Sequence, residues 1–545
     1  MKRKFSVRAL LLMAATSLVF TGCKDKENDL SVKAITVSPS SVTLKPGQSE
    51  TLSVTIFPEN AANKNVSWAS SASEIVSVTG DGKVVAIKEG AATITVTTED
   101  GGEKATSTVT VTAKEMMNVG TSRGAATPVS GTWPKYTIVN MLGQIFVPED
   151  STLTIQEGVE VIVSADAQDN NSTKIELIVE GSLYCLGTAD AQVTFTVPAG
   201  DRDRKTSGRH WGGIIGSTTC AEMLLDHVLV EYTGAITTIA SPSVTKGLFK
   251  AGGGDGMVAF NTNNPSGKYV ITNSTFRYTG EDAIYVQGGD CIFMHNLFYA
   301  VGDEGGEAIN VKAGCVVDAA FNVMYSPNTN AFKLSNAGFG AGRELARINA
   351  YNNTIINSGW RRDPSKPKGG SVWAESGYVN VFNNLIVNCM FAAKAENYQQ
   401  GSAAGTNGVT AESKIDYNFY ASGTAQSSIP QHVTNGTVTA FDGFKPGRTD
   451  DVVYGAHDVR GAAAGENDPL FVSFPFLTNP VVDISYSEAW NFRLQAGSPA
   501  LDASKVRPTA TDGFTRYFAD GITVNGTLYK SPAPAEYFGA FGQNQ

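Results

Sequence analysis

Most motifs that identify an enzyme class are missing from the sequence. The 545 residues contain no HExxH pair, no Walker loop and no nucleotide-binding fingerprint after a predicted strand. These absences argue against zinc peptidases and nucleotide-binding enzymes. Histidine is also scarce: the chain has five, and His227 and His295 lie beside a repeated strand, where packing is their expected role.

Long apolar runs are confined to the N-terminus. After Cys23, no stretch reaches the ~20 continuous apolar residues of a membrane-spanning helix, so none is predicted there. Positive charge is in short supply too. The formal net charge is −10, and it becomes about −14 without the first 22 residues, which contain four Lys or Arg. Such an acidic chain argues against nucleic acid as a partner and says little about a neutral glycan.

Cysteines are few, and their spacing suggests no site. Apart from Cys23 there are five, none in the CxxC spacing of structural zinc or redox sites: Cys185, Cys220, Cys291, Cys315 and Cys389. Buried free thiols are expected, because cysteine packs as a small hydrophobe. A disulfide between Cys291 and Cys315 is the alternative in an oxidising compartment.

The N-terminus has the pattern of a secretory signal. Four Lys or Arg residues precede the run ALLLMAATSLVF, and TGC closes on Cys23. This end resembles a bacterial lipobox, which implies that residues 1–22 are a signal peptide and that Cys23 is acylated by fatty acids such as palmitate. Residues 23–30 contain KDKEND, similar to the acidic tether of surface lipoproteins in some Gram-negative bacteria. The resemblance implies an outer-membrane lipoprotein exposed on the cell surface, with a periplasm-facing lipoprotein as the alternative.

Residues 31–113 predict a β-sandwich. Apolar and polar residues alternate, Val and Thr are enriched, and Gly, Pro, Asn and Asp stand at the breaks. The segments VSWASSASEIVSV and DGKVVAIKEGAATITVTT resemble the bacterial Ig-like group 2 domain, with Trp68 as the expected core aromatic. That resemblance implies a spacer on a cell-surface protein. Residues 114–136 show no strong period and are expected to be a linker or a first strand.

A short phrase is repeated through the rest of the chain. It consists of a polar residue, a variable one and an apolar one: HVL at 227, STF at 274, NLF at 296, NVM at 322, NTI at 353, NLI at 384 and NFY at 418. Repeats of this kind predict stacked coils, each of which buries its apolar residues against the next. Asparagines at equivalent positions would then form a ladder of amides, so Asn296, Asn322, Asn353 and Asn384 are assigned to the scaffold.

Residues 137–545 resemble a right-handed parallel β-helix of the pectate-lyase-like class. The resemblance rests on the repeats, on GSLYCLGTADAQVTFT with HWGGII, and on the closing segments NDPLF, NFRLQAGSPALDAS and YFGAFG. The predicted protein is therefore all-β, an Ig-like sandwich followed by a monomeric solenoid. The fold hosts lyases, hydrolases and non-catalytic binders, so it decides no chemistry by itself.

Two acidic corners are the candidate metal site. Polyuronate lyases of this fold typically combine Ca²⁺-binding carboxylates with a Lys or Arg base, and Ca²⁺ needs six to eight oxygen ligands. The candidate ligands follow repeated strands on consecutive coils: Glu281, Asp282, Asp303, Glu304 and Glu307. Neither corner contains a Lys or Arg, so no catalytic residue is assigned. A solvated corner without metal is the alternative.

A basic and aromatic insertion is the candidate ligand site. Residues 357–377 contain Trp360, Arg361, Arg362 and Trp373, and Lys394 stands at the same corner of the next coil. Aromatic rings stack on sugars, and guanidinium groups pair with carboxylates or sulfates. The alternative is a loop whose tryptophans are buried against the helix.

The leading functional hypothesis is a surface-anchored binder of a polysaccharide or another extracellular ligand. A polysaccharide lyase or glycoside hydrolase at the cell surface is the alternative, and an adhesin is a third. The hydrolase alternative would need two carboxylates about 5–9.5 Å apart, a distance that a sequence does not reveal.

Overall fold

The chain forms two compact units. The first comprises Ser49–Val111 with the two strands before Lys45, and the second runs from Thr112 onward. The computed structural model describes residues 30–164, 173–203, 208–251, 256–303, 305–340, 342–362, 370–390, 393–395, 408–421, 432–434, 437–439, 455–460, 467–474 and 484–543. None of the helices in these ranges has the length and apolar character needed to cross a bilayer.

The first unit is a sandwich of short strands. Its strands are β1 (Ala34–Ser38), β2 (Ser41–Leu44), β3 (Ser49–Thr51), β4 (Ser53–Phe57), β5 (Val66–Ser70), β6 (Val76–Val78), β7 (Lys83–Ala86), β8 (Gly90–Thr98) and β9 (Lys104–Val111). They pair as β1-β4, β2-β9-β8-β5 and β3-β7-β6. Inward residues alternate with exposed ones along β8 and β9, as a sandwich requires.

Trp68 packs against the core of this unit, as the sequence predicts. It contacts two buried clusters, one around Ile94 and the other around Val96. Gly82 makes room for it: its φ is +84°, and a Cβ there would lie 2.8 Å from the indole ring. Glycine is therefore required at this turn.

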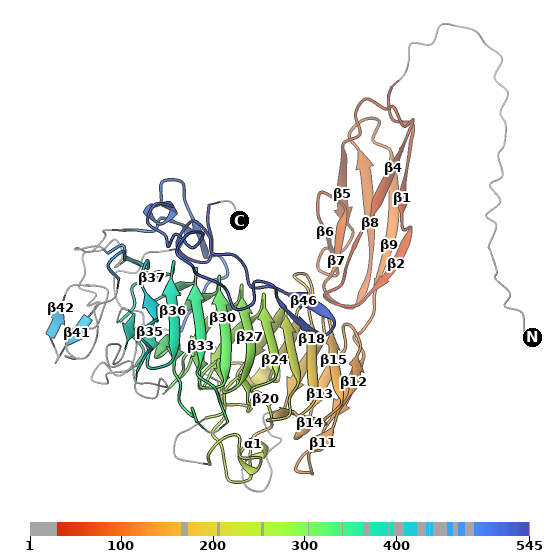
Figure 1. Cartoon of the computed structure of the whole chain (residues 1–545). Coiled ribbons are helices and arrows are strands. Elements are labelled where there is room, and N and C mark those ends of the chain that lie inside the picture. Colours follow the sequence, from red (N-terminus) through yellow and green to blue (C-terminus); the bar gives the residue numbers. More distant parts are fainter. Residues whose placement is uncertain are drawn as a thin grey trace, which may run out of the picture. The chain divides into compact units, whose positions relative to one another are not determined.

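The second unit is a parallel β-helix, built by coiling the chain through three long parallel sheets (Figure 1). Sheet A contains β10 (Met116–Val119), β13 (Ile138–Met141), β16 (Glu160–Val163), β19 (Val193–Thr196), β22 (Val228–Glu231), β25 (Thr275–Thr279), β28 (Leu297–Val301), β31 (Val323–Tyr325), β34 (Thr354–Ile356), β37 (Leu385–Val387) and β40 (Phe419–Ala421).

Sheet B contains β11 (Thr127–Pro128), β14 (Ile145–Val147), β17 (Leu177–Val179), β20 (Ile214–Gly216), β23 (Phe260–Thr262), β26 (Ile284–Val286), β29 (Ile309–Val311), β32 (Asn330–Leu334), β35 (Gly370–Ala374) and β38 (Lys394–Ala395). Sheet C contains β12 (Gly131–Trp133), β15 (Thr152–Gln156), β18 (Ser182–Leu186), β21 (Glu222–Asp226), β24 (Lys268–Thr272), β27 (Gly289–Met294), β30 (Cys315–Ala320), β33 (Arg347–Tyr351), β36 (Tyr378–Phe382) and β39 (Lys414–Ile415). Each strand pairs with its counterparts one coil before and one coil after.

The repeated phrases stack along sheet A. Six of the seven coincide in register: Leu297 pairs with Val323, Val323 with Thr354, and so on through Phe419. The phrase placed at His227 is wrong by one residue, because Leu229 pairs with Thr275 and Val228 therefore lies opposite Ser274. The interval of 47 residues between these two phrases is one coil plus an excursion, since β22 and β25 are neighbours.

An asparagine ladder runs along the turn between sheets C and A. Each side-chain amide donates to the side-chain oxygen of the next: Asn296 to Asn322 (3.0 Å), Asn322 to Asn353 (2.9 Å), Asn353 to Asn384 (2.9 Å) and Asn384 to Asn418 (2.9 Å). Each of these side-chain oxygens also accepts a backbone N–H of the previous coil. For example, the Asn322 N–H donates to the side-chain oxygen of Asn353 (3.0 Å). The scaffold role predicted for these residues is confirmed.

The interior of the coil is apolar, and like side chains stack within it. Phe276 and Phe298, one coil apart, stack with their ring centroids 5.5 Å apart. The five cysteines described are buried and free, so the alternative of a Cys291–Cys315 disulfide is wrong. Burial raises the pKa of the Cys220, Cys315 and Cys389 thiols to about 12.

The C-terminal segment packs on the outer faces of sheets A and C. Its strands are β43 (Phe471–Ser473), β44 (Asn491–Leu494), β45 (Ile522–Val524) and β46 (Thr527–Tyr529), and the paired strands β41 (His432–Thr434) and β42 (Thr437–Thr439) precede them. On sheet A, Tyr486 stacks on Tyr299 with their ring centroids 4.2 Å apart. On sheet C, Asp318 accepts hydrogen bonds from the Phe518 N–H (3.0 Å) and the Ser531 hydroxyl (2.6 Å).

An excursion after β22 covers part of sheet B. It contains α1 (Pro242–Thr245), and Leu248 packs with Ile178 and Ile215, which point outward from β17 and β20. Buried Glu176 holds the excursion by accepting bonds from the N–H (2.8 Å) and the hydroxyl (3.1 Å) of Ser243. Burial raises the pKa of Glu176 to about 8.

Replacing Asn353 by alanine tests the ladder. The change would remove the side-chain bonds of Asn353 to Asn322 and Asn384 and leave the buried Asn322 N–H without its acceptor, and a buried polar group that loses its partner costs about 1–3 kcal/mol. We expect a lower free energy of unfolding, measured by denaturant titration. Asn140→Ala is the matched control, since its amide bond to Asn118 (3.0 Å) is exposed, and its effect should stay within about 0.5 kcal/mol. Equal effects of the two changes would contradict the structural role of the ladder.

Candidate functional site

The outward residues of sheet B change character along the stack. At one register position they run Phe146, Ile178 and Ile215, then Asn261, Tyr285, Asn310, Lys333 and Trp373. The apolar members belong to the cluster that the excursion covers. The polar and aromatic members, on β23 to β35, form what we call the central row. Its Tyr285 still packs against this cluster, with its ring centroid 6.2 Å from that of Phe249.

Two further rows flank the central row. The leading row lies three residues before it in the chain and contains Asp282, Glu307 and Asn330; Asp282 accepts a hydrogen bond from the Asn310 amide of the central row (2.8 Å). The trailing row, two residues after the central row, contains Gln287, Lys312, Ser335 and Glu375. Successive members of a row are one strand spacing apart, about 4.8 Å. The three rows together are the candidate site.

Asp282 and Glu307 form a buried carboxylate pair. The side chain of Asp282 accepts from the Glu307 N–H (2.8 Å) and from the Asn310 amide (2.8 Å), and it shares a hydrogen bond with the Glu307 carboxylate. Burial and the negative charge of Glu307 raise the pKa of Asp282 well above its usual value. Burial alone would raise the pKa of Glu307 too, but the bond from Asp282 and the charges of Lys333 and Lys312 lower it. The proton therefore resides on Asp282.

Two lysines interact electrostatically with this pair. Burial, followed by the charge of Lys333, lowers the pKa of Lys312 to about 8, so a substantial fraction of its amine is neutral at pH 8. Its ammonium nitrogen lies 5.4 Å from the centre of the Tyr285 ring. Lys333 lies over the Trp373 ring at 4.5 Å and 3.8 Å from the Glu375 carboxylate. The site thus has a proton donor, a partly neutral amine and a fixed positive charge.

The remaining acidic-corner residues are held elsewhere. Arg209, from an earlier coil, pairs with Glu281 (3.4 Å) and Asp303 (3.3 Å). Glu304 lies outside the described residues. Within the described ranges, no group of three or more His, Cys, Asp or Glu side chains is placed to hold a metal ion. Ligation of Ca²⁺ by the five predicted carboxylates stays a prediction, and the four that are described have the partners named above.

The predicted aromatic and basic ligand residues separate in the structure. Trp373 and Lys394 pair in register on sheet B, although the side chain of Lys394 is outside the described residues. Trp360 is half-buried, and its indole N–H donates to the Asn388 carbonyl (2.5 Å). Arg361 donates to the backbone carbonyls of Gly302 (2.8 Å), Ser326 (3.1 Å) and Val301, so it braces the turns of neighbouring coils.

Arg361 and Arg362 differ in their surroundings. Burial lowers the pKa of Arg361 to about 10, although the nearby Asp303 favours its charge. Arg362 has a buried Nε without a hydrogen-bond partner among the described residues. Trp373 is therefore the predicted ligand residue that belongs to the three rows, and Trp360 and Arg361 support the adjoining turns.

Sequence reasoning missed Lys312, Lys333, Tyr285 and Asn310. The signal was available in the short strands DAIYVQGG and EAINVKAG, whose fourth and sixth residues align with the third and fifth residues of AFKLSNAG. Arg209 carried no such signal, because it reaches the acidic corners from at least 72 residues away in the chain.

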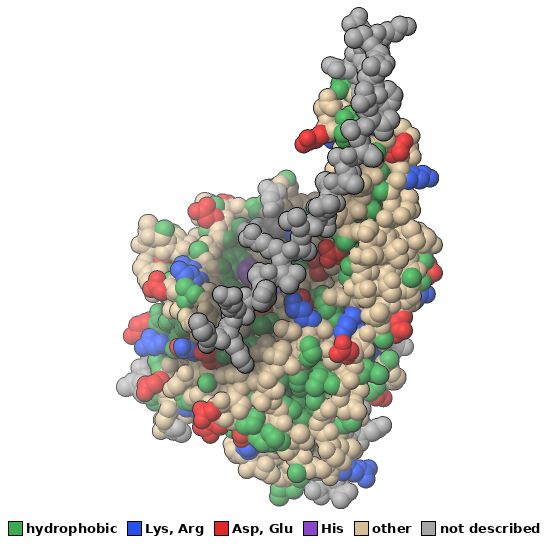
Figure 2. Space-filling view, turned by 90° about the vertical axis from the view of Figure 1, so that its right-hand side faces the viewer, with side chains coloured by type: hydrophobic (Ala, Val, Ile, Leu, Met, Phe, Trp, Pro, Cys, Tyr) green, Lys and Arg blue, Asp and Glu red, His purple; other side chains and the backbone are tan. Residues whose placement is uncertain are grey.

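Charge on the surface of the molecule is mixed. On the face drawn in Figure 2, acidic and basic side chains are interspersed, and the described residues of that face show no large patch of one sign. The charge of this face therefore does not single out a binding surface.

The fold and the comparisons with known proteins agree on the N-terminal unit. The second unit belongs to the class of parallel β-helix solenoids, whose architecture leaves the chemistry open. Residues 31–109 match the family of bacterial Ig-like domains (group 2), so the predicted Ig-like sandwich is confirmed over these residues.

Curated relatives match only short stretches. An alpha-L-arabinofuranosidase of Bifidobacterium longum subsp. longum is 44% identical over 77 residues, which is 14% of this chain and 7% of that protein. A kappa-carrageenase of Pseudoalteromonas carrageenovora is 39% identical over 74 residues, 14% of this chain and 19% of the enzyme. An uncharacterized protein of Clostridium acetobutylicum is 38% identical over 89 residues, 16% of this chain and 9% of that protein. The chain thus spans less than a fifth of the length of each.

Substitution of the two paired carboxylates should have unequal effects. Asp282→Asn replaces a protonated acid by a neutral group of the same shape, so we expect a small change in unfolding free energy. Glu307→Gln removes the charge that balances the two lysines, so we expect a loss on the order of a few kcal/mol. Denaturant titration of both variants at pH 7 measures the difference. A greater loss of unfolding free energy in Asp282→Asn than in Glu307→Gln would show that the proton resides on Glu307 instead.

Proposed function

We propose that the polar part of sheet B binds a polysaccharide at the cell surface. The observation that carries the proposal is the central row, in which Tyr285, Asn310, Lys333 and Trp373 repeat along the stack at one register position. A polymer of sugar residues laid along the stack would meet an aromatic ring, an amide and an ammonium group in succession. Aromatic faces with a few placed polar groups are the usual lining of ligand sites.

The rest of the molecule supports the choice of this face. The C-terminal segment packs on sheets A and C, and the excursion packs on the apolar beginning of sheet B. Burying a polar or charged side chain on a sheet costs free energy unless hydrogen bonds or ion pairs compensate for the lost water. Asp282, Glu307, Lys312 and Lys333 concentrate this cost next to β26, β29 and β32, where they are buried or half-buried and bonded to one another or to neighbouring side chains, and we therefore place the ligand there.

The surface location is part of the same proposal. The Ig-like unit resembles spacers of surface proteins, and two relatives of known name are an arabinofuranosidase and a carrageenase. Cys23, the proposed lipid anchor, lies outside the described residues. In this arrangement the acyl chains hold the protein at the outer membrane, and the Ig-like unit spaces the β-helix from it.

Loss of Trp373 should weaken binding. Purified mature chain is run through gels containing polygalacturonate, alginate, xylan or a β-glucan, and retardation by at least one polymer is expected. Trp373→Ala should lower that affinity about tenfold or more, equal to about 1.4 kcal/mol. Tyr378→Ala, which removes a half-buried ring from sheet C, is the control and should bind normally.

Whole cells test the anchor in the same assay. Cells with the wild-type chain should capture the labelled polymer, whereas cells with Cys23→Ser should release the protein and lose capture. Absence of retardation by every polymer, or equal binding by Trp373→Ala and wild type, would defeat the binding proposal.

A polysaccharide lyase is the second candidate, and the lowered pKa of Lys312 favours it. In a β-elimination, the neutral amine would remove the proton next to the sugar carboxylate, with Lys333 balancing the carboxylate charge. The bond to the leaving oxygen then breaks as a carbon–carbon double bond forms. Protonated Asp282 would supply the proton to that oxygen.

The pH dependence separates the two candidates. For a binder of an acidic polymer, retention should weaken as pH rises through about 8, because Lys312 loses its charge. For a lyase, the rate of formation of ultraviolet-absorbing product should rise over the same interval, because the neutral amine is the reacting form. Lys312→Met should abolish product formation while the chain remains folded. A rate that is independent of Lys312 would remove the lyase assignment.

A further inference from the structure

A cavity of about 650 Å³ lies on a different side of the β-helix from sheet B. Its floor is formed by Leu297 on β28 and Val323 on β31, which point outward from sheet A. One wall is the turn between sheets C and A, and the other is the C-terminal segment from Tyr486 to Arg493. The volume lies within the range of about 300–1,000 Å³ that is typical of small-molecule sites.

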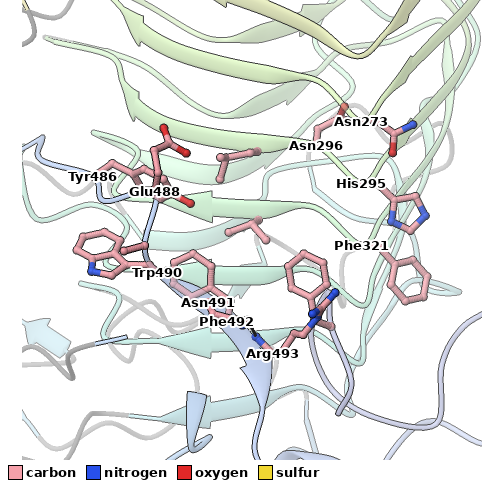
Figure 3. A pocket seen from close by; sticks show the side chains of 14 residues that line it. Asn273, His295, Asn296, Phe321, Tyr486, Glu488, Trp490, Asn491, Phe492 and Arg493 are labelled. Carbon is pink, nitrogen blue, oxygen red and sulfur yellow. Dashed lines mark hydrogen bonds between the residues drawn. The ribbon is translucent and has the colours of Figure 1, made fainter. Parts of the chain in front are cut away.

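The walls present rings and polar groups toward the same space (Figure 3). Tyr486, Glu488 and Trp490 stand on one side, and His295 and Phe321 stand on the other, with Arg493 near the lower edge. His295 and Phe321 are stacked with ring centroids 5.4 Å apart. They occupy equivalent turn positions of consecutive coils, where φ is +58° and +56°. The left-handed turn directs these side chains away from the coil interior.

The aromatic wall is rigid because sheet A supports it. Trp490 packs against Tyr325 at 4.9 Å and Tyr486 at 5.2 Å between ring centroids, and Tyr486 stacks on Tyr299 at 4.2 Å. Glu488 is oriented by Arg277, 3.8 Å away. These walls are already formed before a ligand binds, so ordering them costs little conformational entropy.

Several polar groups at the rim are available to a ligand. Within the described ranges, the side chains of His295, Trp490 and Arg493 form no hydrogen bond, and Arg493 and His295 are exposed. The rim thus offers a guanidinium, an imidazole, an indole N–H and a carboxylate around an apolar floor. A pyranose ring has the complementary form, with an apolar face of C–H groups and a rim of hydroxyls.

We infer that this cavity is a second carbohydrate site, which takes one or two pyranose residues of a polysaccharide chain. Leu297, Val323 and the rings of Trp490 and Phe321 contact the apolar faces of the sugar. Arg493, His295 and Glu488 bind its hydroxyls, and a uronate carboxylate would pair with Arg493. The inference rests on the proposed function in that it assumes a glycan ligand, but it uses none of the residues of sheet B.

Two sites on different sides of one β-helix have a functional consequence. A single molecule would hold two chains, or two turns of one chain, and so cross-link a polysaccharide. Linked sites raise the apparent affinity for a polymer above that for a short oligosaccharide without any new contact.

The test is calorimetric titration of the full mature chain with tetrasaccharides of galacturonate, mannuronate, xylose and glucose. We expect about two equivalents bound by wild type and one by the double variant Arg493→Ala, His295→Ala, whose side chains have no structural hydrogen bond. Trp373→Ala should also retain one equivalent, held in the cavity. Combining the three changes should abolish binding. Arg347→Ala on sheet C is the control for loss of a guanidinium and should bind two.

The fluorescence of Trp490 gives an independent reading. Sugar in the cavity should change the emission of Trp373→Ala, and the additional change Arg493→Ala should weaken that response about tenfold or more. If the Arg493→Ala, His295→Ala double variant still binds two equivalents, the cavity is not a sugar site. If Trp373→Ala loses one equivalent in the same experiment, the site on sheet B still stands. If wild type binds none of the four tetrasaccharides, both proposals fail.

Discussion

Hydrogen bonds from each coil to the next are the constraint on which this structure depends. Backbone pairing fixes the spacing of the coils, and the amide ladder from Asn296 to Asn418 fixes their rotational register at one turn. A slip of one residue at this turn would place a buried amide beside carbonyl groups it does not match. It would also reverse the inward and outward residues of the next strand. The ladder therefore determines which side chains face solvent several coils away.

The candidate site is a product of that register. Asp282 and Glu307 are 25 residues apart in sequence and share a proton because they occupy the same position on consecutive coils. Stacking of the coils also brings Lys312 and Lys333, from other register positions, within electrostatic reach of the pair. Parallel stacking thus concentrates ionisable groups that no local motif would bring together, and burial then separates their pKa values.

The sequence allowed the scaffold to be predicted more fully than the site. The phrases around Asn353 and Asn384 are closely similar, so their alignment in space could be predicted directly. The phrase at His227 was misplaced because Val228 holds the ladder position there without an amide to reveal it. The site eluded sequence reasoning because Lys312 and Lys333 belong to different register positions of different coils. Arg209 was out of reach because a long excursion separates it from the corners it serves. The position at which the C-terminal segment packs could not be predicted either, because that segment has no periodic pattern.

The buried thiols of the β-helix have a further consequence. Cys220, Cys315 and Cys389 have pKa values of about 12, so thiolate, the form that attacks disulfides and reacts with oxidants, is almost absent at neutral pH. Each sulfur is also enclosed within the stack. Once folded, the protein would need neither a disulfide-forming partner nor a reducing surrounding to preserve its interior, and it would tolerate the redox conditions of whichever compartment it occupies.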